Sequence, residues 1–572
     1  MDKIGELRKL MKKNNIDAYI ILTDDFHGSE YVGEYFKARE FMSGFDGSAG
    51  SMVVTENDAG LWTDGRYFLQ AEKQLEGSGI RLFREGEQGV LSIPDYLRRV
   101  LDSHMTIGYD GRTVNGRFGM KLRQALPDNP VCDSCDLVNE IWKDRPGMPK
   151  EPVWLLDEKY TGMSRREKLA RIREKMQTDL HLVTTLDDIA WILNMRGGDI
   201  EYNPTALSYL LIKRCEALLY IEPDKVSEEI EKELARDGVY IRRYDDIYTD
   251  MEKTEEPVML DKNCCNMALL SVIGSIHHAG LPSSIMKACK NETEIRNERE
   301  AHIKDGLALT RFIYRIKHSE GETEMSAAAL LESLRCEGRD YLGQSFAPII
   351  ASGDHGAIVH YEAVPETDRL LADDGFILMD TGGHYLQGTT DVTRTITRGM
   401  LTEEEKRCYT AVLAGNLNIA SARFKKGCSG SNIDYLARSP LWEMDLDYRH
   451  GTGHGVGYLL NVHEGPNAIR LKNADTPFEE GMITSDEPGV YLEGKFGIRL
   501  ENLICAHEDN GFVSFETLTL VPFERAAVIP EMLTEKQKKA LNEYHEKVYK
   551  TISPHLEQEE AEWLYAETRP FK

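Results

Sequence analysis

The pattern of apolar and polar positions at the start of the chain predicts a helix followed by a buried strand. Ile4, Leu7 and Met11 recur at the spacing of one helix face, and the continuous apolar run 18–22 has the length of a strand. A similar pattern returns later, where a helix-period stretch at 165–176 precedes the apolar run 180–183. We therefore predict an internal repeat, in which two α/β domains are built on one plan.

Two segments rich in proline and glycine divide the chain. Residues 143–152 contain three prolines and one glycine, which is typical of a linker. A second boundary falls near 280–284, before a charged helix-period stretch that runs from 291 to about 317. The boundaries predict three domains, at 1–150, 151–286 and 287–572.

Composition narrows the classes of protein and partner. The 96 acidic and 69 basic residues give a formal net charge of −27, which disfavours nucleic acid and anionic membrane surfaces as partners. The N-terminus has no apolar signal-peptide core, and the ten cysteines of this long chain are typical of reduced thiols. We therefore expect a cytoplasmic protein. Cys132 and Cys135 form an isolated CxxC with no second pair nearby, for which we favour a structural role.

Two aspartates bracket a predicted hairpin in the C-terminal part. An apolar strand ends on Asp380, a glycine pair turns the chain, and a second strand arrives at Asp391. A hairpin folds these residues, eleven apart, into one neighbourhood. A single aspartate at a strand end is usually a turn former. Two aspartates at one hairpin are equally consistent with turn formers and with a functional site.

A glycine-rich segment at 449–457 carries two histidines. His450 and His454 are spaced four apart, yet the four glycines of the segment disfavour a helix and so the HExxH arrangement of a zinc protease. Glycines around a histidine instead allow the backbone to approach a metal or a substrate closely. By itself, the segment could equally be an ordinary loop.

Two glutamates occupy strand positions further along. Glu487 ends another predicted strand, at 483–487, and we place Glu501 within an alternating, otherwise apolar strand at 497–506. Burying Glu501 without a counter-charge would cost several kcal/mol. A salt bridge to Arg499, on the same face of that strand, is the structural alternative.

The four carboxylates, taken together, indicate a site for cations. Four negative charges in one site repel strongly unless cations neutralise them, and two divalent ions would supply the required charge. Oxygen-rich ligation with one imidazole favours Mn²⁺, Co²⁺ or Fe²⁺ over a site made of histidine and cysteine. The order of the candidate ligands is Asp380, Asp391, His454, Glu487 and Glu501.

This order resembles the five-ligand signature of the pita-bread dinuclear metallopeptidases, which include methionine aminopeptidase, prolidase and aminopeptidase P. His360-Tyr361 and His463, within the segment 461–466, also match. Similarity to the long, three-domain aminopeptidase P subfamily extends through the segments 41–50, 61–70, 186–191 and 518–523. The resemblance implies two creatinase-N-like α/β domains followed by a C-terminal pita-bread catalytic domain with a helical extension.

The resemblance also implies an activity and the residues that carry it. The enzyme would release the N-terminal residue from peptides with proline in the second position, using two divalent ions, with Mn²⁺ preferred and Co²⁺, Fe²⁺ or Zn²⁺ as alternatives. Glu487 would be both ligand and proton shuttle. His360 and His463 would bind the peptide carbonyl, His450 would line the proline pocket, and Arg499 would position the carboxylates. Each accessory histidine could instead be structural.

Two alternatives stay open. A prolidase, which cleaves Xaa-Pro dipeptides, would use the same site with a different pocket, although the three-domain length favours the aminopeptidase. A non-catalytic pita-bread interaction protein would have lost metal ligands, and this chain keeps the full set. The family further implies a homodimer.

Overall fold

The computed structural model describes residues 2–572. Contacts divide the chain into two compact units. The first extends to Glu158 and includes Met163–Ser283, and the second comprises Lys159–Gly162 and Ser284–Lys572. Within the described residues, no helix is long and apolar enough to cross a membrane.

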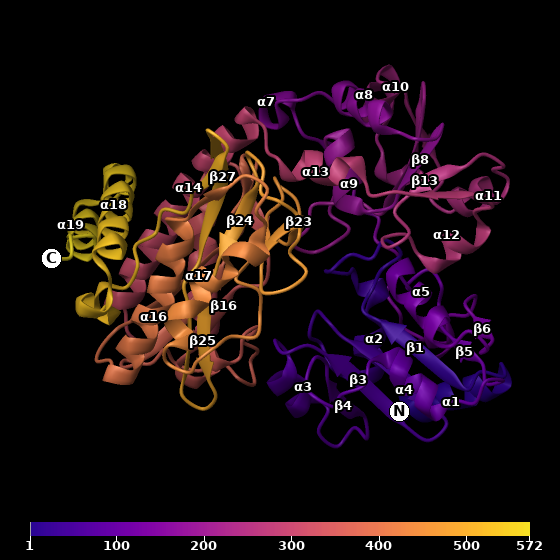
Figure 1. The fold of residues 1–572 in the computed structure, drawn as a ribbon, viewed down its shortest axis with the longest axis horizontal. Helices are drawn as coiled ribbons and strands as arrows, with labels where there is room; N and C mark the ends of the chain where they lie inside the picture. Colours follow the sequence, from indigo (N-terminus) through magenta and orange to yellow (C-terminus); the bar gives the residue numbers. More distant parts are fainter. Residues whose placement is uncertain (1) are drawn as a thin grey trace. The chain divides into compact units, whose positions relative to one another are not determined.

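The first unit begins with a six-stranded mixed sheet. Helix α1 (Lys3–Lys13) leads into strand β1 (Ala18–Leu22), whose five residues are all buried. Strand β1 pairs antiparallel with β2 and parallel with β5. The strand order is β4-β3-β2-β1-β5-β6 (Figure 1), with β2 at Ser51–Thr55, β3 at Ala59–Thr63, β4 at Arg81–Arg84, β5 at Ile107–Gly108 and β6 at Val131–Cys132.

A second sheet in the same unit repeats this plan. Helix α8 (Arg165–Lys175) leads into β8 (Leu180–Val183), which pairs antiparallel with β10 and parallel with β13. The order is β12-β11-β10-β8-β13-β14, with β10 at Ser208–Lys213, β11 at Ala217–Ile221, β12 at Val239–Arg242, β13 at Val258–Leu260 and β14 at Ile276–His278. Each neighbouring pair runs in the same relative direction as its counterpart in the first sheet. The predicted internal repeat is confirmed.

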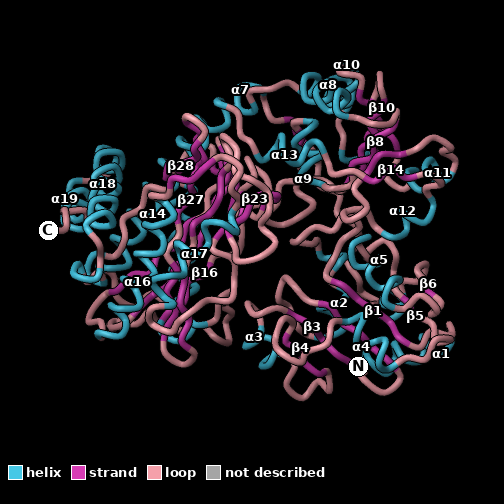
Figure 2. The backbone as a smooth tube through the Cα atoms, viewed as in Figure 1, coloured by secondary structure: helices cyan, strands magenta, loops and turns pink. Residues whose placement is uncertain are grey.

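Helices accompany the strands of both repeats (Figure 2). The predicted linker 143–152 contains neither helix nor strand, and a short pair of strands, β7 (Trp154–Leu155) and β9 (Met195–Arg196), follows it. The remaining helices are α2 (Ala38–Ser43), α3 (Phe68–Gln74), α4 (Ile93–Val100), α5 (Gly116–Ala125), α6 (Leu137–Ile141), α7 (Glu158–Thr161), α9 (Leu186–Leu193), α10 (Glu228–Arg236), α11 (Asp246–Glu252), α12 (Met267–Val272) and α13 (Pro282–Ala288).

The second unit is built on antiparallel sheets. A three-stranded sheet has the order β16-β17-β20, from Ile349–Ser352, Phe376–Thr381 and Val392–Thr397. A six-stranded sheet has the order β21-β28-β27-β24-β22-β23, from Arg423–Lys425, Phe512–Thr517, Asn502–Asp509, Ile483–Asp486, Gly453–Gly455 and Glu464–Ile469. Smaller sheets join β15 (Tyr341–Gln344), β18 (Gly383–Tyr385) and β19 (Gly388–Thr389), and β25 (Gly489–Leu492) with β26 (Phe496–Arg499).

Long helices pack against these sheets. Helix α14 (Glu292–His318) begins at a capping box formed by Asn291 and Glu294, which satisfies backbone groups at its first turn. The C-terminal helices α18 (Glu535–Ile552) and α19 (Gln558–Glu567) pack against α14 (Figure 1). The others are α15 (Glu324–Cys336), α16 (Glu403–Ala420) and α17 (Gly430–Trp442).

Candidate metal centre

The predicted hairpin places two aspartates at neighbouring positions. Strands β17 and β20 pair antiparallel, with Asp380 opposite Thr393, and Asp391 directly precedes β20. The intervening residues form β18 and β19, which belong to a different sheet. The chain therefore leaves the hairpin and returns, and the strand pairing rather than a tight turn sets the positions of the aspartates.

His454 lies on the short strand β22 between two glycines. A Cβ on Gly453 would lie 1.8 Å from the carbonyl oxygen of Ser485, and one on Gly455 would lie 2.1 Å from that of Glu464. The glycines are therefore needed because neighbouring strands approach β22 closely on both sides. The glycine-rich segment is thus a strand at His454, and not a loop throughout.

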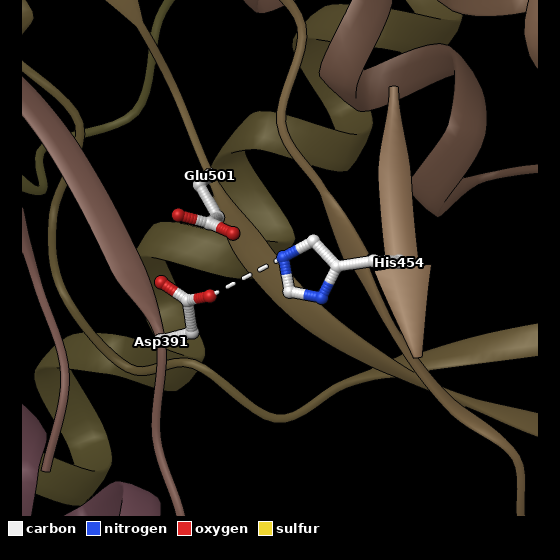
Figure 3. Close-up of side chains that lie close together, drawn as sticks. All are labelled: Asp391, His454 and Glu501. Carbon is white, nitrogen blue, oxygen red and sulfur yellow. Dashed lines mark ion pairs between the residues drawn. The ribbon is translucent and has the colours of Figure 1, made fainter. Parts of the chain in front are cut away.

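The imidazole of His454 faces carboxylates. Its Nδ1 lies 3.0 Å from the carbonyl oxygen of Gly455, and if Nδ1 carries the proton then Nε2 is left with a lone pair. Nε2 lies 3.5 Å from Asp391 Oδ2 and 3.4 Å from Glu487 Oε1. Figure 3 shows Asp391 and Glu501 pointing toward this nitrogen. Asp391, His454 and Glu501 offer ligand atoms that all lie within 4.8 Å of one another.

The two glutamates sit at strand ends, which corrects one prediction. Glu487 directly follows β24, as predicted. Glu501, however, lies between β26 and β27 and not inside a strand. Strand β26 pairs with β25 whereas β27 pairs with β24, so the chain changes sheets at this point. The backbone N–H of Glu501 instead donates to the Thr393 carbonyl at 3.1 Å, and Thr393 Oγ1 donates to Glu501 Oε2 at 2.8 Å.

Burial and mutual repulsion dominate the electrostatics of the cluster. Burial, followed by the charges of Asp380 and Glu487, raises the pKa of Asp391 well above its ordinary value. Burial, followed by the charge of Asp391, does the same to the pKa of Glu501, and burial also raises the pKa of Glu487. Among the described residues, the buried atoms Asp380 Oδ1 and Glu501 Oε1 have no hydrogen-bond partner. Such a set of acceptors is suited to bound cations.

Family models match nearly all of the chain. Metallopeptidase family M24 matches residues 296–508, and the C-terminal region of peptidase M24 matches 511–571. The creatinase/prolidase N-terminal domain matches twice, at 3–143 and 144–294. These matches agree with the two repeated sheets and the antiparallel unit that follows them.

Relatives match over the whole length. A probable Xaa-Pro aminopeptidase P of Laccaria bicolor is 38% identical and aligns with 100% of this chain and 93% of its own. The crystal structure of the X-prolyl aminopeptidase of Caenorhabditis elegans, described as a cytosolic enzyme with a di-nuclear active site, has 34% identity, a TM-score of 0.96, and coverage of 100% of this chain and 99% of its own. The chain belongs to the aminopeptidase P group of metallopeptidase family M24.

A solved Xaa-Pro dipeptidase is similar to only part of this chain. The Xaa-Pro dipeptidase of Bacillus anthracis aligns with 64% of this chain at 23% identity, with a TM-score of 0.52, which shows the fold alone. The full-length matches are with Xaa-Pro aminopeptidases, in agreement with the expectation that the three-domain length favours this activity.

Arg499 contacts a different carboxylate from the one considered for it. The structural alternative paired Arg499 with Glu501, but the guanidinium ion-pairs with Asp380, with Nη2 2.6 Å from Oδ2. Nη1 also donates to the hydroxyl of Tyr491 at 2.8 Å, and that hydroxyl lies 2.8 Å from Nε2 of His450. Arg499 therefore connects the predicted proline-pocket histidine to the carboxylate cluster through Tyr491.

The two remaining histidines, His360 and His463, belong to separate segments of the chain. The His463 ring meets the His454 ring edge-on, with centroids 4.4 Å apart. His360 lies between Val359, whose carbonyl accepts from Arg499 Nη1 at 3.3 Å, and Tyr361, whose hydroxyl donates to Glu324 at 2.7 Å. The segment carrying His360 is thereby tied to the arginine of the cluster.

Sequence reasoning missed several supporting residues. Ser485 Oγ accepts from the backbone N–H of His454 at 2.9 Å and donates to Glu487 Oε1 at 3.1 Å, so it fixes the two relative to each other. Thr393 and Tyr491 were likewise not foreseen. Only the two-residue spacing of Ser485 and Glu487 could have indicated a shared site, because serine and tyrosine are common in strands for other reasons. The CxxC pair lies elsewhere, in the first unit, with Sγ atoms 3.0 Å apart.

Proposed function

We propose that this M24 enzyme releases the N-terminal residue from peptides whose second residue is proline. The observation that carries the proposal is the convergence of Asp391, His454 and Glu501 on one point, in a chain that aligns end to end with Xaa-Pro aminopeptidases. The fold alone would also fit a prolidase, so the full-length relationship decides between the two activities.

Five side chains are proposed to hold two divalent ions. The donor set consists of carboxylates and one imidazole, which suits Mn²⁺, with Co²⁺, Fe²⁺ and Zn²⁺ as alternatives. The unpartnered oxygens of Asp380 and Glu501, and the raised pKa values of Asp391 and Glu501, support this assignment because both features are relieved by positive charge. The proposed ligands are Asp380, Asp391, His454, Glu487 and Glu501.

The ions would act as Lewis acids that make water nucleophilic near neutral pH. Glu487 is proposed to accept a proton from the attacking water and to deliver it to the prolyl nitrogen. His360 and His463 donate hydrogen bonds to the carbonyl oxygen of the scissile bond as negative charge develops on it. His450 borders the proline ring, and Arg499 fixes Asp380 through their ion pair. Because the prolyl nitrogen has no hydrogen and is part of a ring, the bond before proline resists ordinary peptidases. A dedicated pocket must therefore accept the ring.

A substrate comparison tests the proposal. The purified Mn²⁺-loaded protein should release the first residue from an Xaa-Pro-Xaa peptide and leave the matched Xaa-Ala-Xaa peptide uncleaved. Preference for Xaa-Pro dipeptides over longer peptides would favour the prolidase instead. Absence of release from any of these peptides, with the metal bound, would favour a non-catalytic interaction protein.

We also propose the domain boundaries 1–150, 151–286 and 287–572, a homodimer, and a cytoplasmic location. The boundaries are supported by the helix- and strand-free linker at 143–152 and by the division of contacts at Ser283. Limited proteolysis should cut first within 143–152. Sedimentation velocity tests the dimer, because the fitted mass should be twice that of one chain. Imaging of a tagged chain in its source cells tests the location.

A further inference from the structure

A buried lysine pair holds the glutamate that follows His463. Glu464 begins β23, and its carboxylate meets Lys290 Nζ at 2.7 Å through Oε1 and Lys287 Nζ at 2.7 Å through Oε2. The first contact is a hydrogen-bonded ion pair, whereas the second has the distance of an ion pair without hydrogen-bond alignment. The side chains of all three residues are at most 5% exposed.

The lysines reach Glu464 from a distant part of the sequence. Lys287 lies on α13 and Lys290 just after it, 174 residues before Glu464. The backbone N–H of Lys290 donates to the Gly481 carbonyl at 3.1 Å, and a Cβ on Gly481 would lie 2.3 Å from the Lys290 carbonyl oxygen. Lys290 is therefore held by its own backbone before its side chain reaches the carboxylate.

The carboxylate in turn supports both ends of the segment that carries His463. At one end, a Cβ on Gly457 would lie 3.0 Å from Glu464 Oε2, so the backbone of the segment packs on this carboxylate. At the other end, His463 is the residue directly before Glu464. Strand pairing places Glu464 opposite Gly455, the neighbour of His454. Movement of Glu464 would therefore move the His463 ring relative to the His454 ring that it contacts.

We infer that Lys287, Glu464 and Lys290 form a clamp of positioning residues that holds His463 against the metal-ligating side of the site. A buried ion pair is weak evidence for stability, because desolvation offsets the attraction, but in some proteins buried ionic groups specify one arrangement of the chain. Donors to a developing oxyanion require such fixed geometry. The inference rests on the proposed role of His463 and adds the residues that place it.

A double-mutant cycle tests the clamp. Lys290→Met leaves Glu464 with one ammonium partner, so that the remaining pair is electrically neutral. We expect kcat for an Xaa-Pro peptide to fall about tenfold with KM changed less than about twofold, because a displaced donor weakens the transition state more than the bound substrate. In the His463→Ala background the same substitution should change kcat by less than about twofold.

The controls separate positioning from general damage. Bound manganese and the midpoint of thermal unfolding are measured for every variant, and the metal content of Lys290→Met should equal that of the wild type. The control variant is Lys304→Met on α14, which removes an ammonium group that lies 3.0 Å from Asp340 Oδ2. It should leave kcat unchanged. If Lys290→Met does not fold, Lys290→Gln retains a donor at this position and should lower kcat by a smaller factor in the same direction.

The outcomes distinguish the clamp from the function on which it rests. An equal loss of kcat from Lys290→Met with and without His463, an unchanged kcat, or loss of bound metal in the variant would each overturn the clamp and leave the function proposed for the wild type standing. Full kcat in His463→Ala alone would overturn the role proposed for His463 and, with it, the clamp. Absence of Xaa-Pro hydrolysis by the wild type would overturn the proposed function itself.

Discussion

Glu464 and Glu501 are the same residue type at nearly the same depth in one unit, yet their surroundings are opposite. Both are buried, at 4% and 1% exposure. Glu464 faces two ammonium groups at 2.7 Å. Glu501 faces Asp391, Glu487 and Asp380, whose charges add to burial in raising its pKa. The negative charge of Glu464 is neutralised by lysines of the chain, whereas Glu501 is surrounded by other carboxylates.

This difference indicates where an external cation is needed. A folded protein does not retain several ionised carboxylates in a buried cluster without compensation. Around Glu464 the chain provides the compensation with two lysines that are distant in sequence, one on α13 and one just after it. Around Glu501, Arg499 pairs with Asp380, and Arg394 donates to the backbone carbonyl of Glu501 and not to its carboxylate. We therefore expect substitutions at the two places to have different, and in part opposite, consequences.

Removal of a proposed ligand should have the largest effect. Asp391→Ala or His454→Ala takes away one of the groups that converge with Glu501. Hydrolysis of an Xaa-Pro peptide should fall by about 1,000-fold or more, because the nucleophile depends on the metals. Peptide hydrolysis and metal analysis by mass spectrometry are measured together. A metal-free Asp391→Ala protein with wild-type activity would contradict the assignment.

Metal removal from the unaltered chain should come next. Treatment with EDTA should abolish hydrolysis, and added Mn²⁺ should restore it. The free energy of unfolding should also fall, by about 4 kcal/mol for each of the two proposed ions, relative to protein in Mn²⁺ at a thousandfold excess over its dissociation constant, because only the folded chain presents the site. Urea unfolding measures this. Equal stability with and without Mn²⁺ would contradict a compensating role for the ions.

Neutralising Glu464 and neutralising Glu501 should then have different effects on the free energy of unfolding of the metal-free protein. Glu464→Gln leaves two ammonium groups around a neutral amide, so unfolding should require about 3 kcal/mol less. Glu501→Gln removes one of several repelling charges and should leave the stability unchanged or raise it. Urea unfolding of both variants after chelation decides the comparison. Similar losses of unfolding free energy in both variants would show that the surroundings of Glu464 and Glu501 do not differ in the way described.

The smallest expected effect concerns pH. The pKa of Glu501 is raised in the folded, metal-free chain, so the protonated form is favoured by folding. Its contribution to stability is present below the unfolded pKa, about 4.3, and is lost as pH rises toward the folded pKa. Metal-free wild type should therefore lose stability relative to metal-free Glu501→Gln as pH rises above the unfolded pKa of about 4.3. A pH-independent difference between the two proteins would contradict the raised pKa.

The sequence predicts much of this site because the local patterns are strong. An apolar run leads directly to Asp380 in β17, and the repeated helix-strand pattern at 18–22 and 180–183 indicated the duplicated domain. The glycines around His454 indicated close backbone approach, which the neighbouring carbonyl oxygens explain. In each case residues adjacent in the sequence carry the whole signal.

Long-range pairing was beyond the reach of the same reasoning. The residue pattern does not reveal that the chain changes sheets at Glu501, because burial is continuous from β26 into the first five residues of β27. The choice of Asp380 over Glu501 as the partner of Arg499 depends on where two separate sheets meet. Lys290 and Glu464, 174 residues apart, share no local signature at all.

The most direct test of the central claim is the metal stoichiometry of the purified enzyme. Wild type equilibrated with Mn²⁺ and freed of excess ions should contain two manganese ions per chain and cleave Xaa-Pro peptides, while Glu501→Gln prepared in parallel should contain fewer and cleave them far more slowly. A wild-type protein that cleaves these peptides at full rate without bound divalent metal would contradict the account.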